Sequence, residues 1–351
     1  MRTHQTLRRL VSAVCFLALF ALLFTGATQL LRNKNSAGAV LALYEEPKDS
    51  LDVVFIGSSH ILNSVFPMEL WAEYGIVSNN FGQHGQTIPI SYYMVQEAIR
   101  TQHPDLIVLD TYMLYYPELI YDGDGNSHKS IDNMAWAGPK LRAIFDLFKG
   151  EKRWDYLVPL SFFHSRWKEL SAEDLAAPDV AGKGCEYRLG IEPQVLEERV
   201  EPDYRGDLSP VALDYFDRLA GLCREEGVEL VLVCSPFCAD REKQGQMNAV
   251  AGVAEEYGLT YWNYLDRLEE IGFDPATDLY DYSHLNANGA LKFTHAIGAD
   301  LAALGVPDRR GEAAYAGWDG GYALWRAQLE ADAAEAGFPL TVDEREDDLI
   351  Q

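Results

Sequence analysis

Residues 52–60 read Asp52-Val-Val-Phe-Ile-Gly-Ser-Ser-His60, and this stretch decides the fold class. Its four apolar residues end at Gly57, which is typical of a strand buried on both faces of a parallel sheet. A serine on the tight turn after such a strand holds the position of the nucleophile in several hydrolase folds. The stretch does not match the G-x-S-x-G elbow, because Ile61 stands two residues after Ser59. Alone, it predicts a buried strand and a turn rather than an active site.

The alternation of strand-like and helix-like segments continues from residue 51 to residue 305. This pattern favours an α/β domain, a three-layer α/β/α sandwich with a five-stranded parallel sheet in flavodoxin-like order. The predicted strands are 53–56, 76–79, 106–109, 228–233 and 259–262. Loops at the carboxyl ends of these strands should share one edge of the sheet, where such folds bind ligands.

Three helices are predicted late in this domain from their end signals. Ser209-Pro210 begins the first, and Gly227 ends it. The second covers about 247–257. The third covers about 287–304, with Asn286 as its cap.

The amino-terminal segment predicts a membrane anchor. An uncharged, mostly apolar run over residues 10–31 is long enough to span a bilayer as a helix. Arg2, Arg8 and Arg9 precede it, which predicts a cytoplasmic amino terminus and an extracytoplasmic domain. We expect residues 1–32 to form a cytoplasmic tip with an uncleaved single-pass anchor, and 33–50 a juxtamembrane linker. A cleaved signal peptide is the alternative.

The charge of the remaining chain excludes several partner classes. The whole chain has 29 basic and 54 acidic residues, and five of the basic ones precede the first acid, Glu45. The part from Glu45 onward therefore has a net charge of 24 − 54 = −30. So acidic a body is a poor partner for nucleic acid and for anionic lipid surfaces.

The cysteines and histidines give little evidence for disulfides or a metal site. Four cysteines lie outside the anchor, which permits up to two disulfides of open pairing. Cys223 and Cys234 fall on apolar positions, so buried free thiols are the simpler interpretation. No C-x-x-C or H-E-x-x-H occurs, and we expect neither a metal nor a cofactor.

Residues 111–208 predict a helical, aromatic-rich insertion without a sheet strand. Helices are expected near 139–149 and 161–170. The insertion can form an acyl or sugar binding wall at the sheet edge, or a separate small core under a long loop. His164 and Arg166 are candidates to hold a phosphate or carboxylate of a polymer, the alternative for Arg166 being an internal salt bridge.

The carboxyl-terminal residues 306–351 predict an acidic tail with one helix at 322–336. The default for its last residues is solvated or disordered chain. We assign the tail no chemistry.

A second stretch, Asp281-Tyr-Ser-His284, contains the histidine and aspartate that a nucleophilic serine needs beside it. An aspartate three residues before a histidine can accept a hydrogen bond from the imidazole and orient it toward a serine. This is the base and orienter of a serine triad. Two further residues have other expected roles. His60 is expected to be structural. Asp110 is expected either to line the pocket or to begin a solvent-facing loop.

Over about 51–304 the chain resembles the SGNH (GDSL-like) hydrolase superfamily. Gly57-Ser58-Ser59 is similar to its first block, with Ser59 as nucleophile, and Asn80-Phe-Gly-Gln-His-Gly-Gln-Thr87 to its second, with Gly85 as the block's glycine. Asp281 and His284 match its final block. The resemblance implies an oxyanion site made by the N–H groups of Ser59 and Gly85.

The third block departs from this family. Leu109-Asp-Thr-Tyr-Met113 stands where Gly-x-Asn-Asp is usual, so the asparagine that donates to the oxyanion is missing. Loss of one such donor costs on the order of a hundred- to a thousandfold in rate, which slows the chemistry without forbidding it. The candidates for a substitute are Asn80, His84, Thr111 and Tyr112.

The anchor narrows the resemblance to a membrane-tethered branch, which includes D-alanyl transfer proteins of teichoic acid operons and companions of membrane-bound O-acyltransferases. It implies serine-dependent acyl transfer or ester hydrolysis, without a cofactor, on an acylated carbohydrate or polymer of the envelope. The partner it implies is a membrane-bound O-acyltransferase. The alternative is a catalytically weak scaffold of the same fold that binds such an acyltransferase, which the missing asparagine favours.

Overall fold

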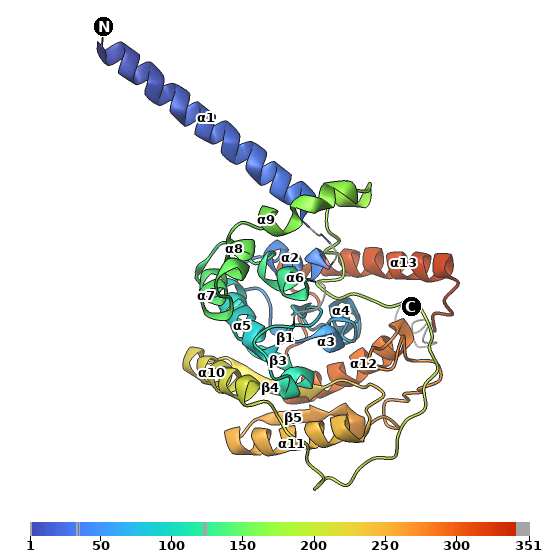
Figure 1. Cartoon of the computed structure of the whole chain (residues 1–351). Helices are drawn as coiled ribbons and strands as arrows, with labels where there is room; N and C mark the ends of the chain where they lie inside the picture. The colour runs from blue at the N-terminus through green and yellow to red at the C-terminus, as the bar shows by residue number, and fades with distance from the viewer. Residues whose placement is uncertain (1, 33, 35, 122–124, 342–351) are drawn as a thin grey trace.

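The structure is a computed structural model that describes residues 2–32, 34, 36–121 and 125–341 (Figure 1). Five parallel strands form one sheet in the order β2-β1-β3-β4-β5, which confirms the predicted fold class. The strands are β1 (Val53–Ile56), β2 (Ser78–Asn80), β3 (Leu106–Asp110), β4 (Glu229–Cys234) and β5 (Thr260–Asn263). The prediction was least accurate for β2, which was expected at 76–79. Ile76 and Val77 are fully buried, as strand residues of such a sheet would be, but they precede the strand.

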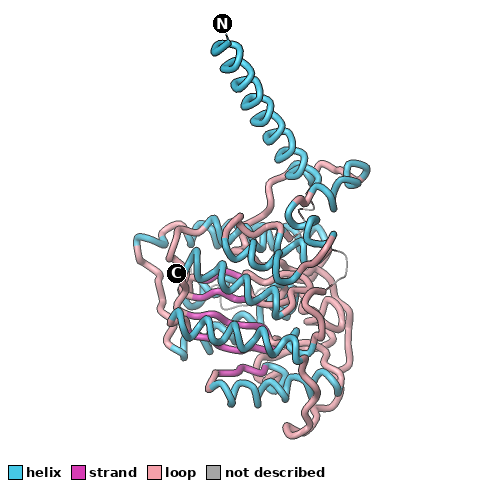
Figure 2. The backbone as a smooth tube through the Cα atoms, turned by 60° about the vertical axis from the view of Figure 1, so that its left-hand side comes forward, coloured by secondary structure: helices cyan, strands magenta, loops and turns pink. Residues whose placement is uncertain are grey.

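Helices cover both faces of the sheet (Figure 2). The helices are α1 (Arg2–Leu31), α2 (Ala37–Glu45), α3 (Ser59–Leu62), α4 (Pro67–Tyr74), α5 (Ile88–Gln102), α6 (Asn126–Ile131), α7 (Gly138–Leu147), α8 (Glu151–Leu157), α9 (Leu160–Phe163), α10 (Pro210–Glu226), α11 (Arg241–Tyr257), α12 (Ala287–Leu304) and α13 (Trp318–Ala336). Short 3-10 helices are η1 (Tyr112–Tyr115), η2 (His164–Lys168), η3 (Glu173–Leu175), η4 (Tyr264–Asp266) and η5 (Ala313–Tyr315). Helices α5 and α10 pack side by side, as α4 and α12 do, while α11 packs against β5.

The predicted helix ends are confirmed where capping residues mark them. The Ser209 side chain accepts a hydrogen bond from the Ala212 N–H at the start of α10, and Asn286 accepts one from the Gly289 N–H at the start of α12. Gly227 ends α10 in the left-handed conformation that glycine favours. Helix α11 begins at Arg241, earlier than predicted, because Asp240 caps it.

The segments on either side of the predicted domain pack into its core. Helix α2 occupies half of the predicted 33–50 linker, and its Val40 and Leu43 are fully buried. Helix α13 lies on α4, where Arg326 and Glu69 form a buried ion pair with an N–O distance of 2.8 Å. The last part of the predicted acidic tail, 342–351, lies outside the described residues.

Helix α1 is the one described helix that is long and apolar enough to cross a membrane. The qualifying segment, Gln5–Leu31, has a mean hydropathy of 2.4 and no residue buried against the rest of the chain. The described cysteines have free thiols, and Cys223 and Cys234 are buried as expected.

The turn after β1 is held by a buried carboxylate. Asp110, the last residue of β3, accepts hydrogen bonds from the Ser58 N–H at 3.2 Å and the Ser58 hydroxyl at 2.7 Å. Its other oxygen accepts the Tyr112 N–H at 3.2 Å. A side chain at Gly57 could not fit, since its Cβ would lie 2.3 Å from the Asp110 Cβ. Ser58 in turn caps α3 by accepting the His60 N–H.

Asp110 should make the stability of the chain depend on pH. Burial raises the pKa of its carboxyl to about 6, against the opposing effect of the bonds from Ser58 and Tyr112. A carboxyl with a higher pKa in the folded than in the unfolded chain stabilises the fold at low pH, and this stabilisation is lost as pH rises. Relative to Asp110→Asn, the wild type should therefore lose about 2 kcal/mol of unfolding free energy between pH 4 and pH 7.

Urea titration of the full chain in detergent at several pH values measures this difference. Asp214→Asn is the matched control, because Asp214 pairs with Arg218 on the exposed surface of α10. A difference between wild type and Asp110→Asn that stays constant with pH would contradict the prediction. It would mean that the three donated bonds balance burial and leave the pKa of Asp110 unchanged on folding.

Candidate active site

Ser59 and His284 lie within hydrogen-bonding distance of each other. Ser59 is the first residue of α3, directly after the turn that Asp110 holds, and its Oγ lies 2.8 Å from the His284 Nε2. The His284 side chain is 25% exposed, so the pair is accessible from solvent. A base within about 3.2 Å of a hydroxyl can accept its proton during attack.

Asp281 orients His284 through a tight turn. Its two carboxylate oxygens lie 3.0 and 2.9 Å from the His284 Nδ1, and Oδ1 also accepts the backbone N–H groups of Ser283 and His284. Partial burial raises the pKa of the Asp281 carboxyl, but these bonds outweigh it and hold the pKa below its ordinary value. A charged Asp281 keeps a proton on Nδ1 and leaves Nε2 free to accept one from Ser59.

The buried side chain of His60 packs beside the turn that presents Ser59. Its buried ring stacks on Tyr112 with a centroid distance of 3.6 Å, and its Nε2 lies 2.8 Å from the Ser283 Oγ. Burial lowers the pKa of His60 well below its ordinary value, and the nearby His284 and Lys243 lower it further. His60 is therefore a neutral residue that ties α3 to the loop carrying Asp281, in keeping with the structural role expected for it.

The two N–H groups expected to bind an oxyanion belong to neighbouring loops. The loop after β2 is attached to the turn after β1 by the Gln83 N–H, which donates to the Gly57 carbonyl at 3.0 Å. Gly85 in this loop has φ of 60°, and a Cβ there would lie 2.9 Å from Tyr121. Among hydrogen bonds between described residues, none uses the N–H of Ser59 or Gly85 as donor.

Two candidates for the missing oxyanion donor are occupied within the fold. The Asn80 amide donates to the carbonyls of Ile61 and Val65 and accepts the Gly82 N–H, which ties β2 to the segment after Ser59. The buried Thr111 donates its hydroxyl to the Val233 carbonyl. Neither side chain is left to bind a substrate, because buried polar groups already satisfy each other here.

The other two candidates lie near the site. Tyr112 packs on His60, as described above. The His84 Nε2 lies 3.0 Å from the Glu186 Oε2 and 3.1 Å from the Arg188 Nη2. Burial lowers the pKa of His84, although Glu186 opposes this effect. The Arg188 guanidinium lies over the ring of Tyr280, 5.7 Å from its centroid, which places this polar cluster beside the Asp281 turn.

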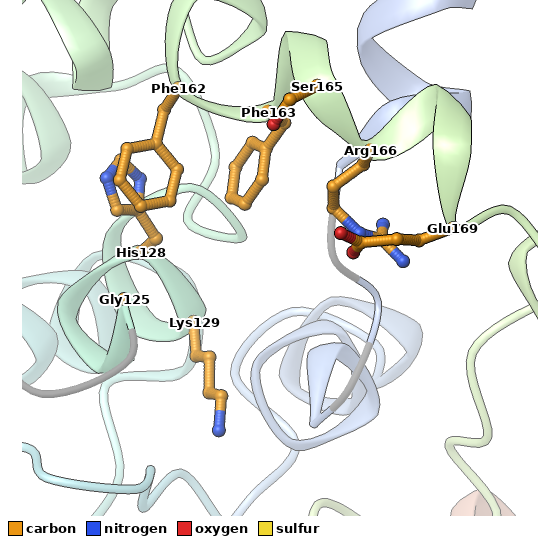
Figure 3. Close-up of a pocket in the computed structure, with 8 residues that line it drawn as sticks. All are labelled: Gly125, His128, Lys129, Phe162, Phe163, Ser165, Arg166 and Glu169. Atoms are coloured by element: carbon orange, nitrogen blue, oxygen red, sulfur yellow. The ribbon is translucent and has the colours of Figure 1, made fainter.

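His164 and Arg166 do not belong to this site. Arg166 donates to the carbonyls of Leu31 and Arg32 at the end of α1 and pairs with Asp174 at 2.8 Å, which is the internal salt bridge of the alternative. The exposed His164 contacts the Ser161 carbonyl. A cavity of about 320 Å³ lies here, between α6 and the α9–η2 segment (Figure 3). Its lining includes Arg166 but none of the three triad residues.

Sequence reasoning missed several residues around Ser59. Tyr280 and Tyr282 flank Asp281 and are 40% and 64% exposed. Lys243 lies 3.0 Å from the centroid of the Tyr115 ring and 5.9 Å from that of Tyr112. The two tyrosines could have been found from their position, since Tyr282 lies within the D-x-x-H turn and Tyr280 directly precedes it. For Lys243 the only indication in the sequence was its position shortly after β4. Among the described residues, no three metal-binding side chains are grouped to hold a metal ion.

No protein-family model matches the sequence, and no curated protein does. Among solved structures, the chain is similar to a proposed acylhydrolase of Bacteroides fragilis NCTC 9343, at 12% identity and a TM-score of 0.38, covering 76% of this chain and 94% of that one. It is also similar to a gut microbial diltiazem-metabolizing enzyme, at 12% identity and a TM-score of 0.30, covering 72% of this chain. The match covers 48% of that second protein's length. Likenesses this weak carry no argument about function, which depends here on the residues of the site.

Proposed function

We propose that the chain is a serine-dependent acyl hydrolase or acyltransferase. The observation that carries this proposal is the Asp281–His284–Ser59 arrangement, with 2.9 Å from Asp281 to the ring and 2.8 Å from the ring to Ser59. These three side chains come from the two ends of the domain and supply, in this order, an orienter, a base and a nucleophile.

The mechanism follows from these positions. The Ser59 Oγ attacks the carbonyl carbon of an acyl ester while the His284 Nε2 takes its proton. The N–H groups of Ser59 and Gly85 donate to the developing oxyanion. His284 then gives the proton to the leaving oxygen, which leaves an acyl-serine. Water or an acceptor hydroxyl, deprotonated by the same histidine, releases the acyl group and restores Ser59.

The proposed substrate class is an acylated polysaccharide or other polymer of a cell envelope. Support comes from the half-open site, where a large molecule can reach Ser59, and from the exposed Tyr280 and Tyr282 beside it, which offer flat surfaces to sugar rings. The helix α1 supports a location at a membrane, and Arg2, Arg8 and Arg9 at its amino-terminal end support an extracytoplasmic domain.

The nucleophile can be tested with a fluorophosphonate probe. Wild type should be labelled at neutral pH, and Ser59→Ala should not, because the probe reacts with a serine activated by a neighbouring base. Ser161→Ala is the matched control, since the exposed Ser161 hydroxyl bonds to Asp155 in the insertion instead of a histidine, and this variant should still react. Equal labelling of Ser59→Ala would refute the assignment. Absent labelling of wild type would favour the acyltransferase-binding scaffold.

The orienting role of Asp281 predicts a loss of rate rather than of binding. Asp281→Asn should lower kcat for a small ester such as p-nitrophenyl acetate by about a hundred- to ten-thousandfold, with a small change in KM, because the amide favours the wrong imidazole tautomer. Asp214→Asn on the exposed face of α10 serves as control and should retain full activity. An Asp281→Asn variant with wild-type kcat would show that His284 needs no orienting carboxylate.

The orientation in the membrane predicts a protease result. Protease added to intact cells should digest the acidic domain and spare only the region of α1, because the arginines at the amino-terminal end of α1 favour retention of that end inside. A cytoplasmic protein in the same cells must stay intact as the control for lysis. Protection of the domain until the cells are opened would reverse the proposed orientation.

A further inference from the structure

Five aromatic residues of the insertion are exposed, and they lie on or beside the successive elements α7, α8, α9 and η2, which pack against one another. We name this set the aromatic face: Trp136, Phe145, Trp154, Phe162 and Trp167, at 60%, 51%, 63%, 44% and 64% exposed. Of the seven tryptophans of the chain, the three in this face are the ones that are exposed. Clustered exposed tryptophans cost free energy in water and mark a surface that contacts something else.

The aromatic face adjoins the end of the membrane-spanning helix. The Arg166 guanidinium donates to the carbonyls of Leu31 and Arg32 at 3.0 and 2.9 Å, so Trp167 follows directly on a residue attached to the end of α1. Helices α9, η2 and η3 contact α1. Figure 1 shows α7, α8 and α9 on the side of the domain from which α1 emerges. When α1 spans a bilayer, this side must face the bilayer surface.

The charge of this segment differs from that of the chain. Residues 138–168 contain seven basic and three acidic residues, within a chain of net charge −25. Two cations lie over exposed rings, Arg153 at 4.8 Å from the Phe145 centroid and Lys168 at 5.6 Å from that of Trp167, whereas Lys140 beside Trp136 is buried. Tryptophan beside lysine or arginine is the composition found where proteins meet lipid headgroups.

We propose that the aromatic face lies on the surface of the bilayer that α1 spans, with Trp136, Trp154 and Trp167 at the level of the headgroups. Its occupant is the lipid surface itself rather than a partner protein. The argument for lipid is the continuity of the face with α1 and its local positive charge. The net negative charge of the domain predicts weak binding to anionic lipid, but residues 138–168 carry a local excess of positive charge. The domain would then rest on the membrane at two places, the end of α1 and the insertion.

Tryptophan fluorescence tests this proposal without interference from the anchor, because residues 1–32 contain no tryptophan. The full chain is placed in nanodiscs whose lipids carry bromine atoms near the headgroup end of the acyl chains. Bromine quenches nearby tryptophan, so wild type should be dimmer than in matched unbrominated nanodiscs. The triple variant W136F/W154F/W167F should lose about half or more of the quenched fraction.

Trp262→Phe is the control variant, since Trp262 lies on β5 and outside the aromatic face; the fluorescence that it loses to bromine should equal the loss in wild type. Resistance of every variant to alkaline extraction from liposomes establishes separately that α1 is inserted. Equal quenching of the triple variant and wild type would overturn the proposal. Absence of quenching in wild type would also overturn it, and cross-linking from position 154 to another protein in native membranes would then identify a partner surface.

Discussion

The hydrogen bonds that Asp110 accepts from Ser58 are the constraint on which the site depends. They join the carboxyl ends of two adjacent strands, β1 and β3, through a buried carboxylate. Gly57 is required because the Asp110 Cβ occupies the space where a side chain would be. Ser58 is thereby fixed as the cap of α3, and the next residue, Ser59, can only point outward from the sheet edge. The direction of the proposed nucleophile is set by a residue fifty positions away.

Other loops of the site are also joined to this turn by single hydrogen-bonding contacts. Gln83 bonds the β2 loop to Gly57, and His60 contacts Ser283 in the loop before α12. Each contact joins a loop from a different strand to the few residues around Ser59. In a parallel sheet the carboxyl ends of all strands meet at one edge, so side chains from distant parts of the sequence can be assembled by short bonds. The insertion contributes mainly through η1, where Tyr112 packs against His60.

Local signals in the sequence were enough for the elements but not for every role. The strand 53–56, the cap at Ser209 and the helix 287–304 were predictable because each depends on residues adjacent in sequence. The pairing of Asp281 with His284 could also be predicted, since both belong to one turn. The role of Asn80 could not, because an asparagine after a strand has the same sequence signal whether its amide faces a ligand or the backbone. Arg166 illustrates the same difficulty, since its partners at residues 31 and 32 are far from it in sequence.

The segment between the anchor and the sheet has a consequence for where the domain can act. Helix α2 buries Val40 and Leu43 in the core, and Arg166 bonds to the carbonyl of Leu31, so the described residues attach the domain closely to the end of α1. A domain attached this way has a small working radius, unlike one on a flexible linker of many residues. If α1 spans a bilayer as proposed, Ser59 would reach only molecules that come to one height above it. Such an arrangement would suit substrates that are themselves confined to the membrane, where diffusion in two dimensions would bring them to the site.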